Sequence, residues 1–511
     1  MKRSIALIAL LATGCMSLEP RLARPDPAIP ASWPAGDVNL SQAEAMLPAV
    51  TYRQIFTDPR LQTLIAQALV NNRDMMTAAA NIDAAREQYF IQRAQQFPQL
   101  NANAGVTLSG RRGGSSNKGT GSGSASGSGS GSGSGSNNSG SGVSADYNLG
   151  LSVPSFELDL FGRLRSLTHA QLEQYLATES GARSTRLTLV ANIADGWLNY
   201  AGDASLLLIA QETLKSAQES VRITRIRLNG GVAPRTDLDQ AQLILSQAQS
   251  DLAQQKTLLA QDVNALQLLV GAPVAQALLP TSIDDALPKI GELPAGVSSY
   301  VLLRRPDVVQ AEYQLRSANA DIGAARAALF PRITLTGLLG FASGALGSLF
   351  TGGAFGWSTA ANASYTIFQA GAGHANVRLT EAQRNAALAT YQKTVQTAFR
   401  EVADALARRA TMDDQLAAAQ AQQTAGADNY LLTETRYREG VDPFLNVLVA
   451  QRSYYTAQTA LVQTKLTAGH NRVDLYQSLG GDPLIANAPV CDVTYVSSAS
   501  SAKLASQCSP M

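Results

Sequence analysis

The 511-residue sequence carries little charge, few histidines and no recognisable catalytic or phosphate-binding motif. Charged residues make up 15% of the chain and the formal net charge is +1, so it lacks the electrostatic signature of a protein that binds nucleic acid or acidic partners. The three histidines, His169, His374 and His470, stand apart in helical surroundings, and no metal-ligand spacing or nucleophile motif occurs. We therefore expect no nucleic-acid partner, no catalytic residue, no metal site and no cofactor other than the lipid considered below.

Cysteine is also scarce, and its three positions lie near the two ends of the chain. Cys491 and Cys508 fall in a Ser- and Ala-rich C-terminal tail over 483–511. An oxidising compartment would permit a disulfide between them, and two free thiols are the equal alternative.

The N-terminus has the pattern of an export signal. Lys2 and Arg3 precede an apolar run over 5–12, which is too short to span a membrane as a helix, and small residues follow before Cys15. This order resembles a bacterial lipobox, in which the cysteine is acylated and becomes the first residue of the mature protein. We therefore predict a lipoprotein signal peptide over 1–14, a covalent lipid on Cys15 and a proline-rich extended tether over 15–50. An ordinary signal peptide with an incidental Cys15 is the alternative.

A long helical hairpin dominates the centre of the chain. The returning arm, which lies within 165–271, repeats leucine every seventh residue, as the seam of a coiled coil does. These leucines are Leu238, Leu245, Leu252, Leu259 and Leu266. The outgoing arm over 165–229 would be about 100 Å long at ~1.5 Å per residue, roughly three times the hydrocarbon thickness of a bilayer. Such a length spans a distance and is not needed to bury a core.

The same unit occurs twice, which indicates two tandem repeats. Gly-Val-Ala-Pro at 231–234 returns as Gly-Val-Asp-Pro at 440–443, 209 positions later. We assign repeat 1 to 51–280, with a helix, a strand, a flexible Gly/Ser loop over 109–144, a strand and the long hairpin. Repeat 2 follows over 281–482 with the same layout.

Short alternating segments predict four β-strands. Apolar and polar residues alternate within 100–108, 147–153, 333–341 and 357–367, and each segment is close to the length of a tilted strand that crosses a bilayer. Half-buried hairpins of a soluble sheet are the alternative. Four strands cannot close a pore in lipid, so a membrane location requires oligomerisation, and a trimer would supply twelve strands.

Five stretches resemble the TolC-like outer-membrane efflux protein family, in the lipoprotein branch that serves resistance-nodulation-division (RND) pumps. They lie at 56–61, 156–163, 303–308, 318–326 and 436–442. The resemblance implies a mainly α-helical homotrimer with a small β part: a 12-stranded β-barrel in the outer membrane, continued into a 12-helix periplasmic α-barrel. It also implies a periplasmic adaptor, an inner-membrane RND pump and passive export of drugs, toxic compounds or metabolites. Met16 fits outer-membrane delivery, because lipoproteins retained in the inner membrane are expected to have Asp there.

The functional residues are expected at the two hairpin tips and at a gate beside them. Glycine permits a tight turn, and proline is tolerated where a returning helix begins. The adaptor-contacting candidates are Gly230, Gly231, Val232, Pro234, Gly440, Val441, Asp442 and Pro443, and the gate candidates are Leu445, Arg452, Asp237 and Arg438. Val449 stands where the family often has an acidic residue, so an acidic constriction is not expected at that level. The simpler alternatives are capped hairpins without a gate and, for the whole protein, a lipid-anchored periplasmic coiled-coil scaffold or trimeric surface protein without a pore.

Overall fold

The computed structural model describes residues 17–22, 29–30, 51–110, 143–292 and 299–480. The chain divides into two compact units, and each draws on both sequence repeats. Unit 1 comprises Met1–Asp26, Ala80–Glu179 and Gln310–Lys393, and unit 2 comprises Pro27–Ala79, Ser180–Val309 and Thr394–Met511. The predicted signal peptide, Cys15, most of the Gly/Ser loop and the tail cysteines Cys491 and Cys508 lie outside the described residues.

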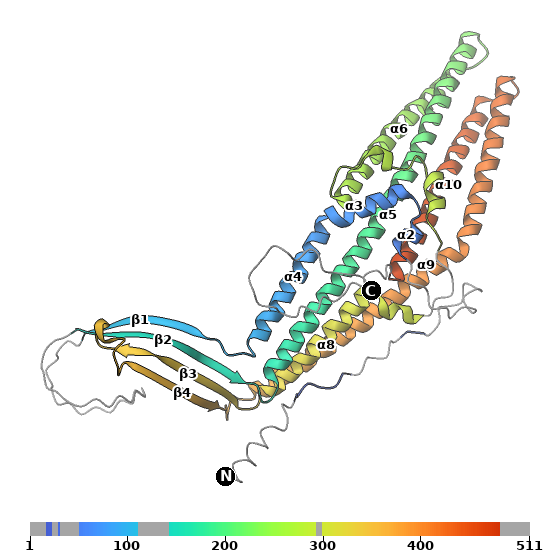
Figure 1. Ribbon diagram of the computed structural model, residues 1–511. Helices are drawn as coiled ribbons and strands as arrows, with labels where there is room; N and C mark the ends of the chain where they lie inside the picture. The colour runs from blue at the N-terminus through green and yellow to red at the C-terminus, as the bar shows by residue number, and fades with distance from the viewer. Residues whose placement is uncertain (1–16, 23–28, 31–50, 111–142, 293–298, 481–511) are drawn as a thin grey trace. The chain divides into compact units, whose positions relative to one another are not determined.

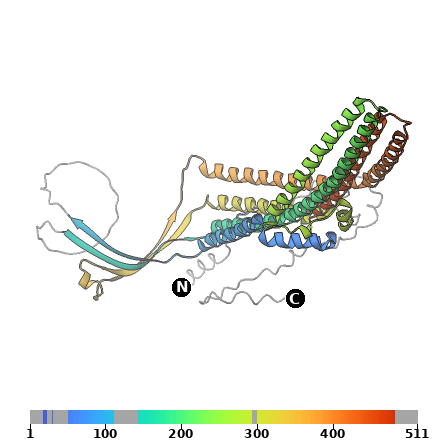
Figure 2. The same cartoon turned by 90° about the horizontal axis from the view of Figure 1, so that it is seen from above.

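Unit 1 contains one antiparallel sheet of four strands in the order β1-β2-β3-β4 (Figures 1 and 2). The strands are β1 (Asn101–Gly110), β2 (Val143–Leu158), β3 (Arg332–Ser343) and β4 (Phe355–Ser364). All four predicted strands are present. The fourth is shorter than expected, because β4 ends at Ser364 and Ile367 lies beyond it. A 3-10 turn, η5 (Leu346–Ser348), lies between β3 and β4.

The sheet has one continuous apolar face. Paired residues in neighbouring strands share a face, and two apolar rows cross all four strands. The rows are Ala104, Leu149, Phe341 and Phe355, and Ala102, Leu151, Leu339 and Trp357. A β-bulge in β2 lies between Val153 and Phe156, where Pro154 cannot donate a ladder hydrogen bond. The extra residue keeps Phe156 opposite Leu335, so the apolar face continues past the proline.

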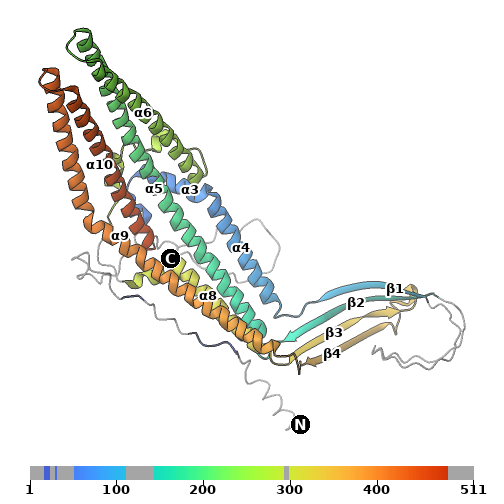
Figure 3. The ribbon, with the colours of Figure 1, turned by 180° about the vertical axis from the view of Figure 1, so that it is seen from behind.

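Four long helices form the two predicted hairpins: α5 (Arg163–Asn229) with α6 (Arg235–Val270), and α9 (Ala372–Arg438) with α10 (Phe444–Ser478) (Figures 1 and 3). The helices α5 and α9 both contain 67 residues, and their limits differ by the same 209 positions as the tip motifs. The tandem helical hairpins expected from the sequence are thereby confirmed.

The single helix predicted at the start of repeat 1 is two helices, α3 (Pro59–Asn71) and α4 (Arg73–Ala94), preceded by the short α2 (Tyr52–Ile55). The break occurs at Asn72, which is buried. Its side-chain amide donates to the Leu269 carbonyl (2.8 Å), and its oxygen accepts from the Asp74 backbone N–H (2.8 Å). Asn72 therefore caps α4 and ties the break to the end of α6.

The core of unit 2 surrounds Trp197 on α5. Trp197 is fully buried, and its indole N–H donates to the Leu278 carbonyl (3.1 Å). Phe56 packs edge-to-face on Tyr476 at a centroid distance of 5.3 Å. Short elements connect α6 to α8 (Pro306–Ala327): η2 (Gln276–Leu278), α7 (Ile283–Ala286), η3 (Leu287–Lys289) and η4 (Ser299–Arg304). The core thus joins the short α2–α3 region to both long hairpins.

Candidate functional site at the hairpin tips

The two tips share one hydrogen-bonding pattern at equivalent positions. In tip 1 (230–234), the backbone N–H groups of Gly231 and Val232 donate to the carbonyls of Leu228 and Arg227. In tip 2 (439–443), Gly440 and Val441 repeat these bonds with Tyr437 and Arg436.

One glycine in each tip is conformationally required. Gly231 and Gly440 have φ of +72° and +79°, a left-handed conformation that a side chain disfavours. Gly230 has no positive φ, and Glu439 occupies its place in tip 2. The turn therefore needs one glycine rather than the pair present in tip 1.

Both returning helices begin after a proline. Pro234 and Pro443 are the N-caps of α6 and α10, with φ of −74° and −70°. Asp237 lies in the first turn of α6, where a carboxylate interacts favourably with the helix dipole. Val232 and Val441, between turn and cap, expose 67% and 61% of their surface. Each tip therefore presents an apolar side chain next to a rigid helix start.

The tips differ in the partners of two equivalent arginines, Arg227 and Arg436. In tip 2, Arg436 Nε donates to Asp442 Oδ2 (2.6 Å) and closes its own turn. Tip 1 has Ala233 in place of Asp442, and Arg227 contacts the other hairpin instead. Its Nη1 donates to the Tyr437 carbonyl (2.7 Å), and its guanidinium lies 4.6 Å from the Tyr437 ring centroid. We call this pair the tip clasp.

A hydrogen-bonded network also joins the two hairpins. Gln451 Nε2 on α10 donates to Ser216 Oγ on α5 (3.1 Å), and Ser216 is 2.7 Å from the Tyr430 hydroxyl on α9. Burial raises the pKa of Tyr430, so its hydroxyl stays neutral at physiological pH. An apolar cluster with members on all four long helices completes this region: Val221, Ala241, Tyr437, Phe444 and Val447. The two hairpins are therefore held together as one body near the tips.

The predicted gate residues are not brought together within one chain. Leu445 and Val449 expose 57% and 59% of their surface, and they share one face of α10 with the exposed Arg452. In the part of the chain that the structure describes, no ion pair involves the Arg452 guanidinium. Arg438 is paired with Glu434 on its own helix (2.7 Å). This open face requires a partner outside the single chain if it is to be covered.

Sequence reasoning did not single out Ser216, Tyr430 and Tyr437 as residues that join the hairpins. Tyr437 lies inside the family-like stretch 436–442, and this stretch was the one sequence feature that could have pointed to it. Ser216 and Tyr430 lie in no motif that would distinguish them from their neighbours. Among the described residues, no group of three or more His, Cys, Asp or Glu side chains is placed to hold a metal ion. No described helix is long and apolar enough to cross a membrane.

Comparison with known proteins identifies the family. The sequence profile of the family described as Outer membrane efflux protein matches residues 64–272 and 297–481. The chain belongs to this family. It is 40% identical to the probable efflux pump outer membrane protein TtgC of Pseudomonas putida over 481 residues, covering 94% of this chain and 95% of TtgC. It is 35% identical to the cation efflux system protein CusC of Escherichia coli over 474 residues, covering 93% and 98%.

A solved member of the family has the same fold. The open state of the Neisseria gonorrhoeae MtrE outer membrane channel superposes with a TM-score of 0.77 at 34% identity, covering 91% of this chain and 98% of MtrE. The efflux family, the mainly helical fold with a small sheet and the outer-membrane location predicted from sequence are confirmed. The protein is an outer-membrane efflux channel and not an enzyme, and the scaffold alternative is not supported.

Proposed function

We propose that three copies of the protein form one continuous duct. The observation that carries this proposal is the four-stranded sheet, which has an apolar face and two strand edges, on β1 and β4, that none of the described strands pairs. Unpaired backbone N–H and C=O groups are costly in lipid, so these edges need partners from other copies. Barrels of this kind need at least about eight strands, and three copies supply a closed ring of twelve. The helices of the three chains then continue the duct as a 12-helix periplasmic barrel.

The membrane end is anchored twice in this proposal. The apolar rows of the sheet face the lipid, and an acyl group on Cys15 inserts beside them. Outer-membrane lipid is thus a direct partner of both features. The proline-rich tether over 15–50 connects the acylated cysteine to the folded body.

At the other end, the two tips meet a periplasmic adaptor, which links the duct to an inner-membrane RND pump. Val232 and Val441 are exposed apolar contacts for the adaptor, next to the capped helix starts. The tip clasp and the α10 face with Leu445 and Arg452 hold the resting tips together. The family channel MtrE has been captured in an open state, which supports a duct that changes between closed and open forms.

The transported compounds are selected by the pump in this proposal. The name of the related CusC specifies cation efflux, whereas the name of TtgC specifies an efflux pump and no class of substrate. Channels of one architecture thus serve the export of chemically different compounds. The protein itself is a passive conduit for drugs, toxic compounds or metabolites.

Two measurements test the proposal. Native mass spectrometry of the detergent-purified protein is expected to give the mass of three chains, and a monomer would refute the trimer. In planar bilayers we expect small, flickering conductance that increases in Arg452→Ala. The matched control is Arg222→Ala, because Arg222 is paired with Glu219 on its own helix (2.5 Å). Absence of any conductance would refute the pore, and equal effects of both variants would remove Arg452 from the gate.

A further inference from the structure

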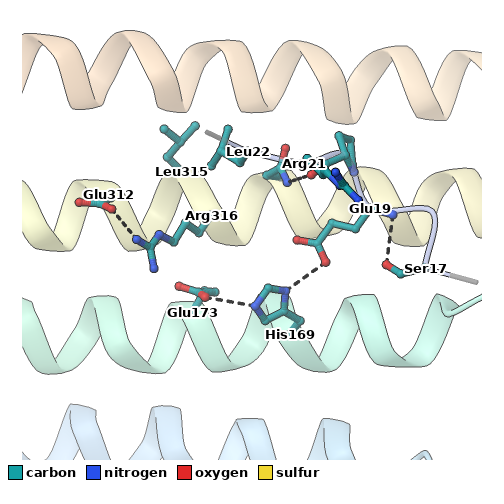
Figure 4. A pocket seen from close by; sticks show the side chains of 11 residues that line it. Ser17, Glu19, Arg21, Leu22, His169, Glu173, Glu312, Leu315 and Arg316 are labelled. Atoms are coloured by element: carbon teal, nitrogen blue, oxygen red, sulfur yellow. Dashed lines mark hydrogen bonds and ion pairs between the residues drawn. The ribbon is translucent and has the colours of Figure 1, made fainter. Parts of the chain in front are cut away.

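The segment 17–22 lies against the helices of unit 1. It has no regular secondary structure and forms one wall of a pocket whose other walls are α5 and α8; we call this pocket the groove (Figure 4). The amide of Asn319 on α8 donates to the Pro20 carbonyl (2.8 Å), and Asn319 is 2% exposed. The two helices are themselves joined by Ser317 Oγ, which donates to the Ala170 carbonyl (2.9 Å). A buried side chain on a fixed pair of helices thus recognises the backbone of this segment.

A histidine on α5 joins the segment electrostatically. His169 Nδ1 is 3.1 Å from Glu19 Oε2, and His169 Nε2 is 3.2 Å from Glu173 Oε1 (Figure 4). The two carboxylates raise the pKa of His169 to about 10, so the imidazolium persists at neutral pH. The groove has three other charged groups. Arg21 belongs to the segment, and Glu312 and Arg316 on α8 form an ion pair with each other at 2.5 Å.

Gly323 on α8 is required by close approach of the segment. A Cβ at this position would lie 2.9 Å from the Cα of Glu19 and 2.7 Å from the hydroxyl oxygen of Ser166. These separations are below ordinary contact, and the neighbouring atoms include backbone. Gly323 lies in the family-like stretch 318–326, and its φ is not positive. Glycine is therefore needed here because a side chain would collide with the segment, and not because the backbone makes a turn.

The segment also satisfies a polar side chain that lies against it. Asn319 is buried with the segment in place, and its side-chain amide has the Pro20 carbonyl as its hydrogen-bond acceptor. A buried polar group without a partner is unfavourable, so this contact with Pro20 stabilises the segment against the two helices.

We propose that this groove is an intramolecular binding site for residues 17–22, recognised by His169, Asn319 and Gly323, and that it fixes the position of the lipid anchor relative to the strands. Ser17 is two residues after Cys15, a reach of at most about 7 Å. His169 lies six residues into α5, about 9 Å along the helix from Arg163, which follows β2 closely. The consequence for the anchor rests on the acylation of Cys15 proposed above, whereas the binding site itself does not.

Limited trypsin digestion of the full-length protein in detergent tests the site, because Arg21 precedes Leu22 and is a cleavage position within the segment. We expect slow cleavage after Arg21 in the wild type and about tenfold faster cleavage in Glu19→Gln and in Gly323→Ala, measured by mass spectrometry. Ser17→Ala is the matched control, since among the described residues the Ser17 hydroxyl accepts a hydrogen bond from within the segment, from the Glu19 N–H (3.3 Å). His169→Gln should resemble Glu19→Gln, and His169→Lys should restore part of the protection by restoring the charge.

Equal cleavage rates in the wild type and Glu19→Gln would overturn the proposal. Glu19→Gln alters only the segment, so this comparison stands even if Gly323→Ala disturbs the helices. The Cys15→Ser protein separates the two ideas. Protection that persists without acylation supports the binding site whether or not Cys15 carries a lipid, and loss of protection in Cys15→Ser alone would show that the lipid, rather than the groove, holds the segment.

Discussion

Removal of Arg227 is the most direct test of how the tips are held. In Arg227→Ala the guanidinium leaves both the Tyr437 carbonyl, to which it donates at 2.7 Å, and the Tyr437 ring, whose centroid is 4.6 Å away. No other side chain of tip 1 replaces these contacts, because Ala233 stands where tip 2 has Asp442. We expect the two hairpins to separate more readily and the closed form to lose population.

The magnitude follows from the two contacts. A cation–π contact contributes about 0.5–2 kcal/mol, and a hydrogen bond to a charged group about 1.5–3 kcal/mol. Arg227 is partly exposed, so solvent screening reduces the sum to about 1–3 kcal/mol per chain. If the clasp exists only in the closed form, this energy changes the ratio of open to closed tips about 5- to 150-fold.

Single-channel recording in planar bilayers measures the effect as open probability. The matched control is Arg436→Ala, because Arg436 is the repeat equivalent of Arg227 but bonds Asp442 within its own turn. Arg227→Lys retains the charge without the planar fork and should lie between wild type and Arg227→Ala. If Arg436→Ala opens the channel as much as Arg227→Ala, local turn stability would account for the result and the clasp would not.

Three further predictions concern other parts of the structure. Burial and the neighbouring Asp203 carboxyl raise the pKa of Asp262 to about 7. Between about pH 4 and pH 7 the folded protein therefore holds a proton on Asp262 that the unfolded chain has lost. The free energy of unfolding is expected to fall as the pH rises through this range. Asp262→Asn should flatten this dependence, measured by circular dichroism melts at pH 5 and pH 8; an unchanged pH dependence would contradict it. Gly440→Ala should destabilise tip 2 by about 1–2 kcal/mol, since φ is +79°, whereas Gly230→Ala should be neutral; hydrogen exchange at the tips distinguishes them. Trp197→Ala should cost about 3–5 kcal/mol in denaturant unfolding, and a loss below about 1 kcal/mol would show that Trp197 is not central to the core of unit 2.

Asn72 and His169 show why part of the structure could not be predicted. The segment around Asn72 contains no proline or glycine, and its pattern is helical on both sides. The break depends on the Leu269 carbonyl, 197 residues away, which the Asn72 amide binds. His169 stood apart from other ionisable motifs in the sequence, yet its partner Glu19 is 150 residues away in the chain. Both contacts arise only when segments distant in sequence pack together.

The sequence by itself determined the tandem repeat, the four long helices, the four strands and the positions of both tips. These features depend on local periodicity and on turn residues such as Gly231 and Gly440, whose conformational preferences act within a few positions. Only the tertiary structure decided that Arg227 and Arg436, equivalent in the repeat, have different partners. The reason is that Tyr437 reaches Arg227 through the packing of one hairpin on the other, and the partner of a long side chain is chosen by that packing rather than by its own neighbours in sequence.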